Sequence, residues 1–82
     1  MEHKLKVWPE CFKPLWSGEK TFELRKDDRG FRAGDTLILQ EWSQRYGYTG
    51  REIVADVPYI WGGLGLKEGW VIMSIKTVKD KL

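Results

Sequence analysis

A single cysteine in a chain of 82 residues constrains the fold more than any other feature of this sequence. Small domains bury a smaller share of their surface than larger ones do, and many are held together by disulfide bonds. Cys11 has no partner in the chain, so apolar packing must supply the stability, and five Trp, three Tyr and three Phe provide the bulk. We therefore expect one domain over residues 1–82, with Cys11 packed as a small hydrophobic side chain.

The charge balance and the hydropathy pattern exclude two broad classes of protein. Lys and Arg number 14 and Asp and Glu number 12, and the resulting net charge of +2 is too small for binding duplex nucleic acid by bulk electrostatics. Any contact with nucleic acid must come from a local patch. No stretch approaches the ~20 apolar residues of a membrane span, and residues 1–6 lack the apolar run of a signal peptide. With its lone cysteine, the sequence predicts a cytoplasmic protein with no membrane partner.

One short helix is predicted over residues 10–17. Phe12, Leu15 and Trp16 fall at positions i, i+3 and i+4, so they share one helical face, in the core or covering the helix. Pro14 lies inside this segment and removes an interior backbone donor. We therefore expect a short or distorted helix.

Alternating apolar residues predict five strands in the rest of the chain. The third carries three apolar residues in succession at 37–39, which is typical of a central strand buried on both faces. Pro58 weakens the far end of the fourth, and residues 79–82 are expected to form a frayed polar tail. Five strands and one helix predict a strongly bent antiparallel sheet or a small barrel, because closure removes exposed edges. The predicted strands span residues 4–8, 20–26, 35–43, 52–60 and 70–78.

The strand at residues 20–26 raises the question of a functional site. Alternation places Phe22 and Leu24 on one face, as core residues, and Glu23 and Arg25 on the other. The ordinary interpretation is that the second face carries solvated ion pairs, which contribute little to stability.

A binding interpretation of the same face competes with the ordinary one. Thr21, Glu23 and Arg25 offer a hydroxyl, a carboxylate and a guanidinium to one ligand, and Gly18 permits a turn that brings Lys20 beside them. The cations suit a phosphate or a carbonyl, and the carboxylate suits an amine edge.

The spacing G-x-K-x-x-E-x-R, formed by Gly18, Lys20, Glu23 and Arg25, resembles the signature of the ASCH domain, a branch of the PUA-like superfamily. The segments FRAGDTLILQEW, YTGREI and WVIMSI follow it, as in the small stand-alone ASCH proteins of bacteria and phages that lack an assigned function. The resemblance covers nearly the whole chain. It implies an α+β fold, a PUA-like pseudo-barrel of about five mainly antiparallel strands with one short N-terminal helix. It also implies recognition of RNA or a modified nucleoside in a cleft lined by the signature residues.

One branch of that family is an amidohydrolase that acts on N4-acetylcytidine through a lysine, a threonine and a glutamate. By this resemblance the lysine corresponds to Lys20. Glu23 stands where the threonine is expected, and Thr21 lies two positions earlier. Asp56 and Glu68 are the candidates for the later glutamate. Lys20 and Glu23 are the catalytic candidates if the protein is an enzyme, and the departure at position 23 favours binding over catalysis.

Two further segments carry candidate ligand contacts. Trp8 is either a stacking platform for a base or a core residue, and Lys6 shares its strand face. Tyr48, Thr49 and Arg51 combine an aromatic ring, a hydroxyl and a cation on the turn expected between the third and fourth strands. That mixture suits base stacking with a phosphate contact, although a structural turn explains the neighbouring glycines.

The remaining polar residues are given simpler roles. Asp27 and Asp28 lie between Lys26 and Arg29 and lack the spacing of metal ligands, so we expect them to form turns and not a metal site. Arg29 is expected to reach a backbone phosphate. His3 is expected at the surface without a general-base role. No metal and no cofactor are expected.

The sequence therefore supports three competing functions. The first is binding of RNA or a nucleotide in a polar cleft, the second is hydrolysis of an acylated nucleoside, and the third is a protein-interaction role with Trp61 as the contact. The candidate ligand-binding residues are Lys6, Trp8, Lys20, Thr21, Glu23, Arg25, Arg29, Tyr48, Thr49 and Arg51.

Overall fold

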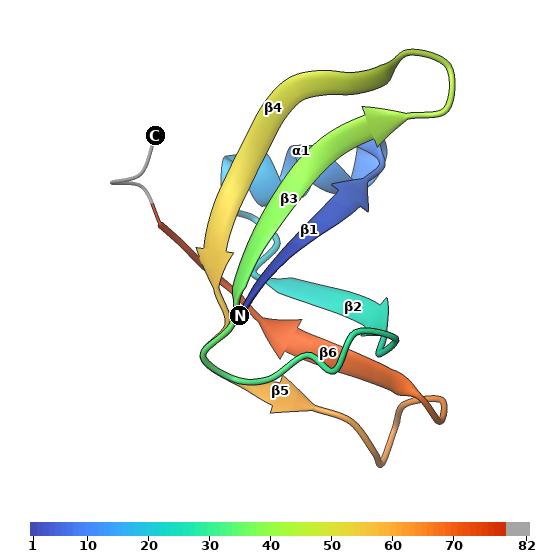
Figure 1. The fold of residues 1–82 in the computed structure, drawn as a ribbon, viewed down its shortest axis with the longest axis vertical. Helices are drawn as coiled ribbons and strands as arrows, with labels where there is room; N and C mark the ends of the chain where they lie inside the picture. The colour runs from blue at the N-terminus through green and yellow to red at the C-terminus, as the bar shows by residue number, and fades with distance from the viewer. Residues whose placement is uncertain (79–82) are drawn as a thin grey trace.

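The structure is a computed structural model, and it describes residues 1–78. These residues form one helix and seven strands in two sheets, which is an α+β fold (Figure 1). The helix is α1 (Pro9–Ser17). The strands are β1 (Glu2–Val7), β2 (Phe22–Lys26), β3 (Thr36–Ser43), β4 (Gly47–Asp56), β5 (Ile60–Trp61), β6 (Trp70–Ser74) and β7 (Lys76–Thr77). The frayed tail expected at residues 79–82 lies outside the described residues.

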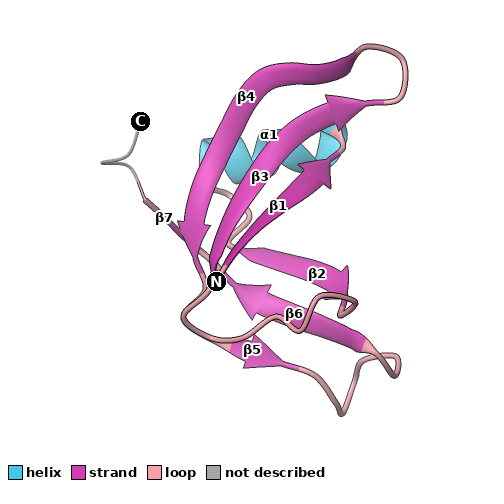
Figure 2. Ribbon diagram, in the orientation of Figure 1, coloured by secondary structure: helices cyan, strands magenta, loops and turns pink. Residues whose placement is uncertain are grey.

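The two sheets do not close on each other. The larger sheet has the strand order β1-β3-β4-β7 and the smaller has the order β2-β6-β5. β1 and β2 each end their sheet without pairing to one another, so residues 1–78 form no closed barrel. Figure 2 shows the smaller sheet below the larger one, with α1 behind the larger sheet. Within the described part of the chain, no helix is long and apolar enough to cross a membrane.

Helix α1 confirms the predicted segment. Pro9 occupies its first turn, and Gly18, with φ of 87°, ends it by donating its N–H to the Leu15 carbonyl. Phe12 and Leu15 are buried, whereas Trp16 is 51% exposed and covers the Phe12 ring at 5.6 Å between centroids. The helix packs mainly against β3, and of the three apolar residues only Phe12 and Leu15 are buried.

β3 is the central strand that the sequence predicts, flanked by β1 and β4. β1 runs parallel to β3, with Glu2 opposite Thr36 and Val7 opposite Glu41, whereas the remaining strand pairs are antiparallel. Parallel neighbours need a crossover connection, which here contains α1 and β2. This connection makes the fold a mixed α+β arrangement and not a purely antiparallel meander.

All five predicted strands differ at their ends from those in the structure, and the fourth and fifth differ most. β4 already begins at Gly47, so residues 47–51 belong to a strand and the hairpin turn is confined to residues 44–46. The predicted strand at 52–60 is interrupted near Pro58, which has no N–H for the ladder, and its end becomes β5. The predicted strand at 70–78 is divided into β6 and β7, because the chain there leaves the smaller sheet and joins the edge of the larger one.

The orientation of β2 is opposite to the prediction. Glu23 is 3% exposed, whereas Phe22 and Leu24 are 43% and 46% exposed. Glu23 lies opposite Met73 of β6, which is fully buried, and paired residues of antiparallel strands point to the same face. β2 therefore takes its orientation from β6, and its polar face turns inward.

A buried polar pair accompanies the apolar core, and it corrects the expected position of His3. His3 is 5% exposed because it shares the inward face of β1, and its Nε2 lies 2.8 Å from Asp35 Oδ2. The Arg32 backbone N–H also donates to Asp35, and the His3 ring meets Phe31 edge-on at 4.8 Å. The apolar core consists of Leu5, Val7, Phe12, Leu15, Phe31, Leu37, Leu39, Ile53, Val57, Val71 and Met73.

The hydrogen bonds to Asp35 predict an acid-sensitive contribution to stability. The bond from His3, followed by the bond from the Arg32 N–H, lowers the pKa of Asp35 from 3.8 to about 2. A carboxyl whose pKa is depressed by folding stabilises the fold in full above its unfolded value and loses that effect as the pH falls through its folded value. We therefore expect the free energy of unfolding to fall between about pH 4 and pH 2. Urea denaturation of wild type and Asp35→Asn across this window tests it, and equal pH dependence of the two proteins would contradict it.

Candidate functional site

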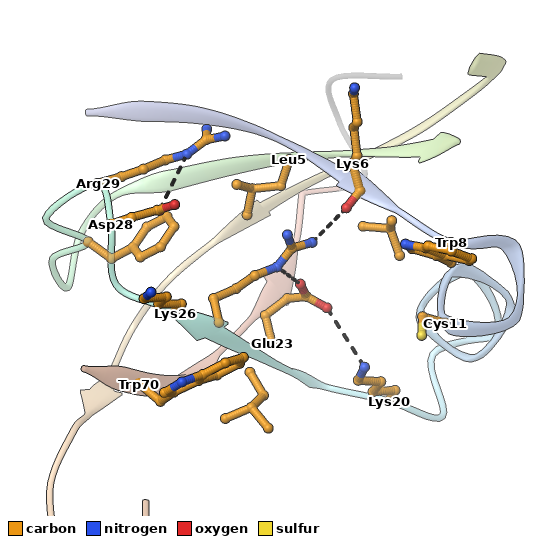
Figure 3. A pocket seen from close by; sticks show the side chains of 14 residues that line it. Leu5, Lys6, Trp8, Cys11, Lys20, Glu23, Lys26, Asp28, Arg29 and Trp70 are labelled. Carbon is orange, nitrogen blue, oxygen red and sulfur yellow. Dashed lines mark hydrogen bonds and ion pairs between the residues drawn. The ribbon is translucent and has the colours of Figure 1, made fainter. Parts of the chain in front are cut away.

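A cleft of about 420 Å³ opens between the free edges of β1 and β2 (Figure 3). Its volume falls within the range of small-molecule sites. The start of α1 closes one end, and the loop after β2 closes the other. The lining residues are Leu5, Lys6, Val7, Trp8, Cys11, Lys20, Glu23, Leu24, Arg25, Lys26, Asp28, Arg29, Phe31 and Trp70.

Three signature residues converge in this cleft around a buried carboxylate. Arg25 Nε donates to Glu23 Oε2 at 2.9 Å, and Lys20 Nζ lies 3.8 Å from Glu23 Oε1. The Glu23 side chain is 4% exposed, whereas those of Lys20 and Arg25 are 24% and 27% exposed. Lys20 reaches this position because its N–H donates to the Pro14 carbonyl and holds the turn after α1. The inward rotation of β2 thus buries the acid and leaves both cations in contact with solvent.

One oxygen of the Glu23 carboxylate keeps its capacity to accept a hydrogen bond. Among residues 1–78, Arg25 alone donates to this carboxylate, and it does so on Oε2. The separation of 3.8 Å between Lys20 Nζ and Oε1 is too long for a hydrogen bond. Buried carboxylates ordinarily have donors on both oxygens, so Oε1 is suited to accept a hydrogen bond from a ligand. The wall of the cleft therefore offers an acceptor, Glu23 Oε1, next to a donor, the Lys20 ammonium.

The arginines also hold the two sheet edges together. Arg25 Nη2 donates to the Lys6 carbonyl at 2.9 Å, and Arg29 Nη1 donates to the Lys4 carbonyl at 2.7 Å. An edge strand exposes unpaired carbonyl groups, and these two guanidinium groups take the place of a neighbouring strand on β1. Arg25 therefore has a structural role in addition to any ligand contact.

Aromatic rings and a thiol complete the cleft. Trp8 is 54% exposed and lines the end near α1, as its interpretation as a stacking platform requires. Cys11 is exposed beside it, so the expectation of a packed cysteine is wrong. Its position on α1 faces the cleft and not the sheet. Trp70 and Lys26 also line the cleft and were missed by sequence reasoning, because only the β2–β6 register places them opposite each other.

Five predicted ligand contacts do not bring their side chains into the cleft, and Lys6 and Thr21 are the two nearest to it in the sequence. The Lys6 ammonium lies 4.6 Å from the Trp42 ring centroid on the outer face of the larger sheet, so only the Lys6 backbone reaches the cleft (Figure 3). Thr21 is exposed and does not line the cleft, and its carbonyl accepts the Ile75 N–H.

Thr49 and Arg51 form a separate polar cluster around Glu41, away from the cleft. The hydroxyl of Thr49 donates to Glu41 Oε1 at 2.7 Å, and Arg51 Nε donates to the same oxygen at 2.9 Å. The bond from Arg51, followed by that from Thr49, lowers the pKa of Glu41. The Arg51 guanidinium lies 5.3 Å from the Trp16 ring centroid, so this cluster ties the β3–β4 hairpin to α1.

Tyr48 lies on the outer face of the larger sheet, 56% exposed, with the Lys6 ammonium 5.9 Å from its ring centroid. Tyr48 pairs with Trp42, and its neighbour Thr49 points to the opposite face of the strand. The register shift between Gln40 and Trp42 leaves residues 49–51 opposite Glu41. The sequence groups Tyr48, Thr49 and Arg51 into one candidate surface, but Tyr48 lies on the outer face of the sheet and the other two contact Glu41.

Comparison with known proteins identifies relatives of unassigned function. A segment of 55 residues, 67% of this chain, is 42% identical to an "Uncharacterized 12.9 kDa protein in GpA 3'region" of Escherichia phage P2. The matched segment covers 50% of that relative, so the chain spans about half the length of the curated protein it matches. Residues 2–75 match the family described as "Domain of unknown function (DUF3850)". The chain therefore belongs to the DUF3850 family.

Proposed function

We propose that the cleft between β1 and β2 binds a nucleotide, either free or as a unit of RNA. The observation that carries this proposal is the buried Glu23 carboxylate, which turns its Oε1 toward the cleft with Lys20 Nζ 3.8 Å away. Nucleobases present N–H donors and acceptors side by side on one edge, which complements an acceptor beside a donor. The exposed Trp8 indole supplies a surface for stacking a base.

We also propose that the fold is a PUA-like pseudo-barrel of the ASCH type, open at one seam. The support is that Lys20, Glu23 and Arg25, the residues of the G-x-K-x-x-E-x-R spacing, converge on one cleft. The arginine contacts across the seam give a physical reason why two sheets in this arrangement stay together without pairing.

Binding is tested with nucleosides and nucleotides, and Cys11 reports the location. Because Cys11 is the one cysteine of the chain and lines the cleft, a ligand seated there should slow its alkylation. We expect Trp8→Ala to weaken binding by about 5- to 150-fold, the effect of ~1–3 kcal/mol of stacking energy. Glu23→Gln should weaken it about tenfold or more, because hydrogen bonds to charged groups contribute ~1.5–3 kcal/mol.

Lys13→Ala is the matched control, since Lys13 is exposed on α1 and does not line the cleft. Circular dichroism of each variant separates lost binding from lost folding. If no nucleoside or nucleotide protects Cys11 from alkylation, the proposal is wrong and a protein-interaction role is favoured.

A hydrolase of acylated nucleosides is the second candidate, favoured by the closeness of Lys20 to Glu23 in the same cleft. Glu23 would take a proton from a water that attacks the acyl carbon, and would pass this proton to the amino nitrogen of the nucleoside as the C–N bond breaks and acetate forms. Lys20 would stabilise the negative charge that develops on the acyl oxygen. Incubation with N4-acetylcytidine tests this candidate. Release of acetate by wild type but not by Lys20→Ala supports it, and equal rates for the two proteins exclude it.

A further inference from the structure

We infer that the end of the cleft formed by Lys26 and Arg29 binds the phosphate group of the nucleotide. This inference rests on the proposed nucleotide-binding function and adds a direction to it. The base would lie toward Trp8, Lys20 and Glu23, and the phosphate toward the loop after β2.

The two ends of the cleft differ in how their negative charge is held. Glu23 is 3% exposed and fixed by Arg25, so a phosphate placed beside it would meet a buried like charge that cannot move away. Asp28, at the other end, has a side chain that is 69% exposed and lies 4.0 Å from Arg29 Nε. A charge of that kind is screened by solvent and can swing aside. The phosphate is therefore excluded from the Glu23 end and tolerated at the Asp28 end.

The cations at the Asp28 end are available for a ligand. Lys26 is exposed, lines the cleft and makes no ion pair with any residue of the described range 1–78. Arg29 Nη1 donates to the Lys4 carbonyl, which fixes the guanidinium at the mouth of the cleft (Figure 3). Within residues 1–78, Nη2 makes no hydrogen bond and can donate to a ligand. A fixed guanidinium with a flexible ammonium beside it is a suitable pair for a phosphate.

The spacing of the two ends suits one nucleotide. Glu23 and Lys26 lie on the same strand, three residues apart, so their Cα atoms are separated by about 10 Å at ~3.3 Å per residue. That is the scale of one nucleotide from base edge to phosphate. The side chains of Glu23 and Lys26 point to opposite faces of β2, and both line the cleft because it runs along the unpaired edge of this strand. Trp70 lies opposite Lys26 in the β2–β6 register and borders the same end of the cleft.

The experiment compares the affinity of one nucleoside with that of its 5′-monophosphate, its 3′-monophosphate and a dinucleotide. We expect a phosphate to raise the affinity about tenfold at low salt, with the gain shrinking as salt rises. Tighter binding of a monophosphate indicates a free nucleotide as the source of the phosphate, and tighter binding of the dinucleotide indicates an RNA strand. Either result supports the inference.

Lys26→Ala should remove most of the phosphate gain and leave nucleoside affinity unchanged, while Lys13→Ala should change neither. Arg29→Ala is the second variant, and thermal denaturation shows whether loss of its bond to Lys4 has affected the fold. The inference is overturned if the nucleoside and its phosphates bind with equal affinity. It is also overturned if Lys26→Ala and Arg29→Ala both keep the affinity gain that the phosphate provides. Nucleoside binding with Cys11 protection but without a phosphate gain overturns this inference alone. If the nucleoside, its monophosphates and the dinucleotide all fail to bind, the proposed function is overturned as well.

Discussion

Replacement of Arg25 by alanine is expected to lower the free energy of unfolding by about 3 kcal/mol, the lower end of the effect of breaking a buried ion pair. The change removes the hydrogen bond at 2.9 Å to Glu23 Oε2 and the bond at 2.9 Å to the Lys6 carbonyl. The Glu23 carboxylate, which is 3% exposed in wild type, would then keep Lys20, at 3.8 Å, as its one ion-pair partner among residues 1–78. Equilibrium urea denaturation measures the loss.

Two variants distinguish loss of the ion pair with Glu23 from a general loss of arginine contacts to β1. Arg29→Ala also removes a bond from an arginine to β1, but its partner is a neutral carbonyl and its side chain is 44% exposed, so we expect about 1 kcal/mol. The double variant Glu23→Gln/Arg25→Ala removes the buried charge and should recover part of the stability. Equal losses for Arg25→Ala and Arg29→Ala would show that the buried carboxylate is not the cause.

Leu37→Ala is expected to cost about 2–5 kcal/mol, whereas Leu24→Ala is expected to cost about 1 kcal/mol or less. Leu37 lies in the central strand β3 with no exposed surface, while Leu24 on β2 is 46% exposed. The same chemical change at both positions therefore compares a core site with a surface site. For a domain of this size, 1 kcal/mol corresponds to about 4–8 °C in melting temperature, so thermal denaturation resolves the difference.

This comparison also tests the orientation of β2 directly. Alternation alone predicts that Leu24 is a core residue, in which case its truncation would cost as much as that of Leu37. Similar losses at the two positions would mean that β2 turns its apolar face inward and that Glu23 lies in solvent.

Part of the candidate site follows from the sequence. The spacing of Lys20, Glu23 and Arg25 predicts that they act together, and all three line one cleft. Alternation along the strand also predicts an exposed polar face, whereas the carboxylate is buried and Arg25 bridges the sheets. Spacing within a strand shows which side chains share a face, but it does not show which face is covered.

The grouping of more distant residues needed the tertiary structure. Lys6 and Trp8 share a strand phase, but the strand ends at Val7, and the Lys6 ammonium packs on Trp42 while Trp8 lines the cleft. Thr49 and Arg51 donate hydrogen bonds to Glu41, eight and ten residues earlier in the chain, because the register shift between β3 and β4 places them opposite it. No local pattern carries that information.

The sequence by itself determined the local elements whose signals lie within a few residues. These are helix α1, with Phe12 and Leu15 buried and Gly18 at its end, and the central strand β3 with its run of apolar residues. Only the tertiary structure decided that β2 turns Glu23 inward, that β1 runs parallel to β3, and that the two free edges face each other across a cleft. The physical reason is that an edge strand takes its orientation and register from its partner, and β6, the partner of β2, follows more than forty residues later in the chain.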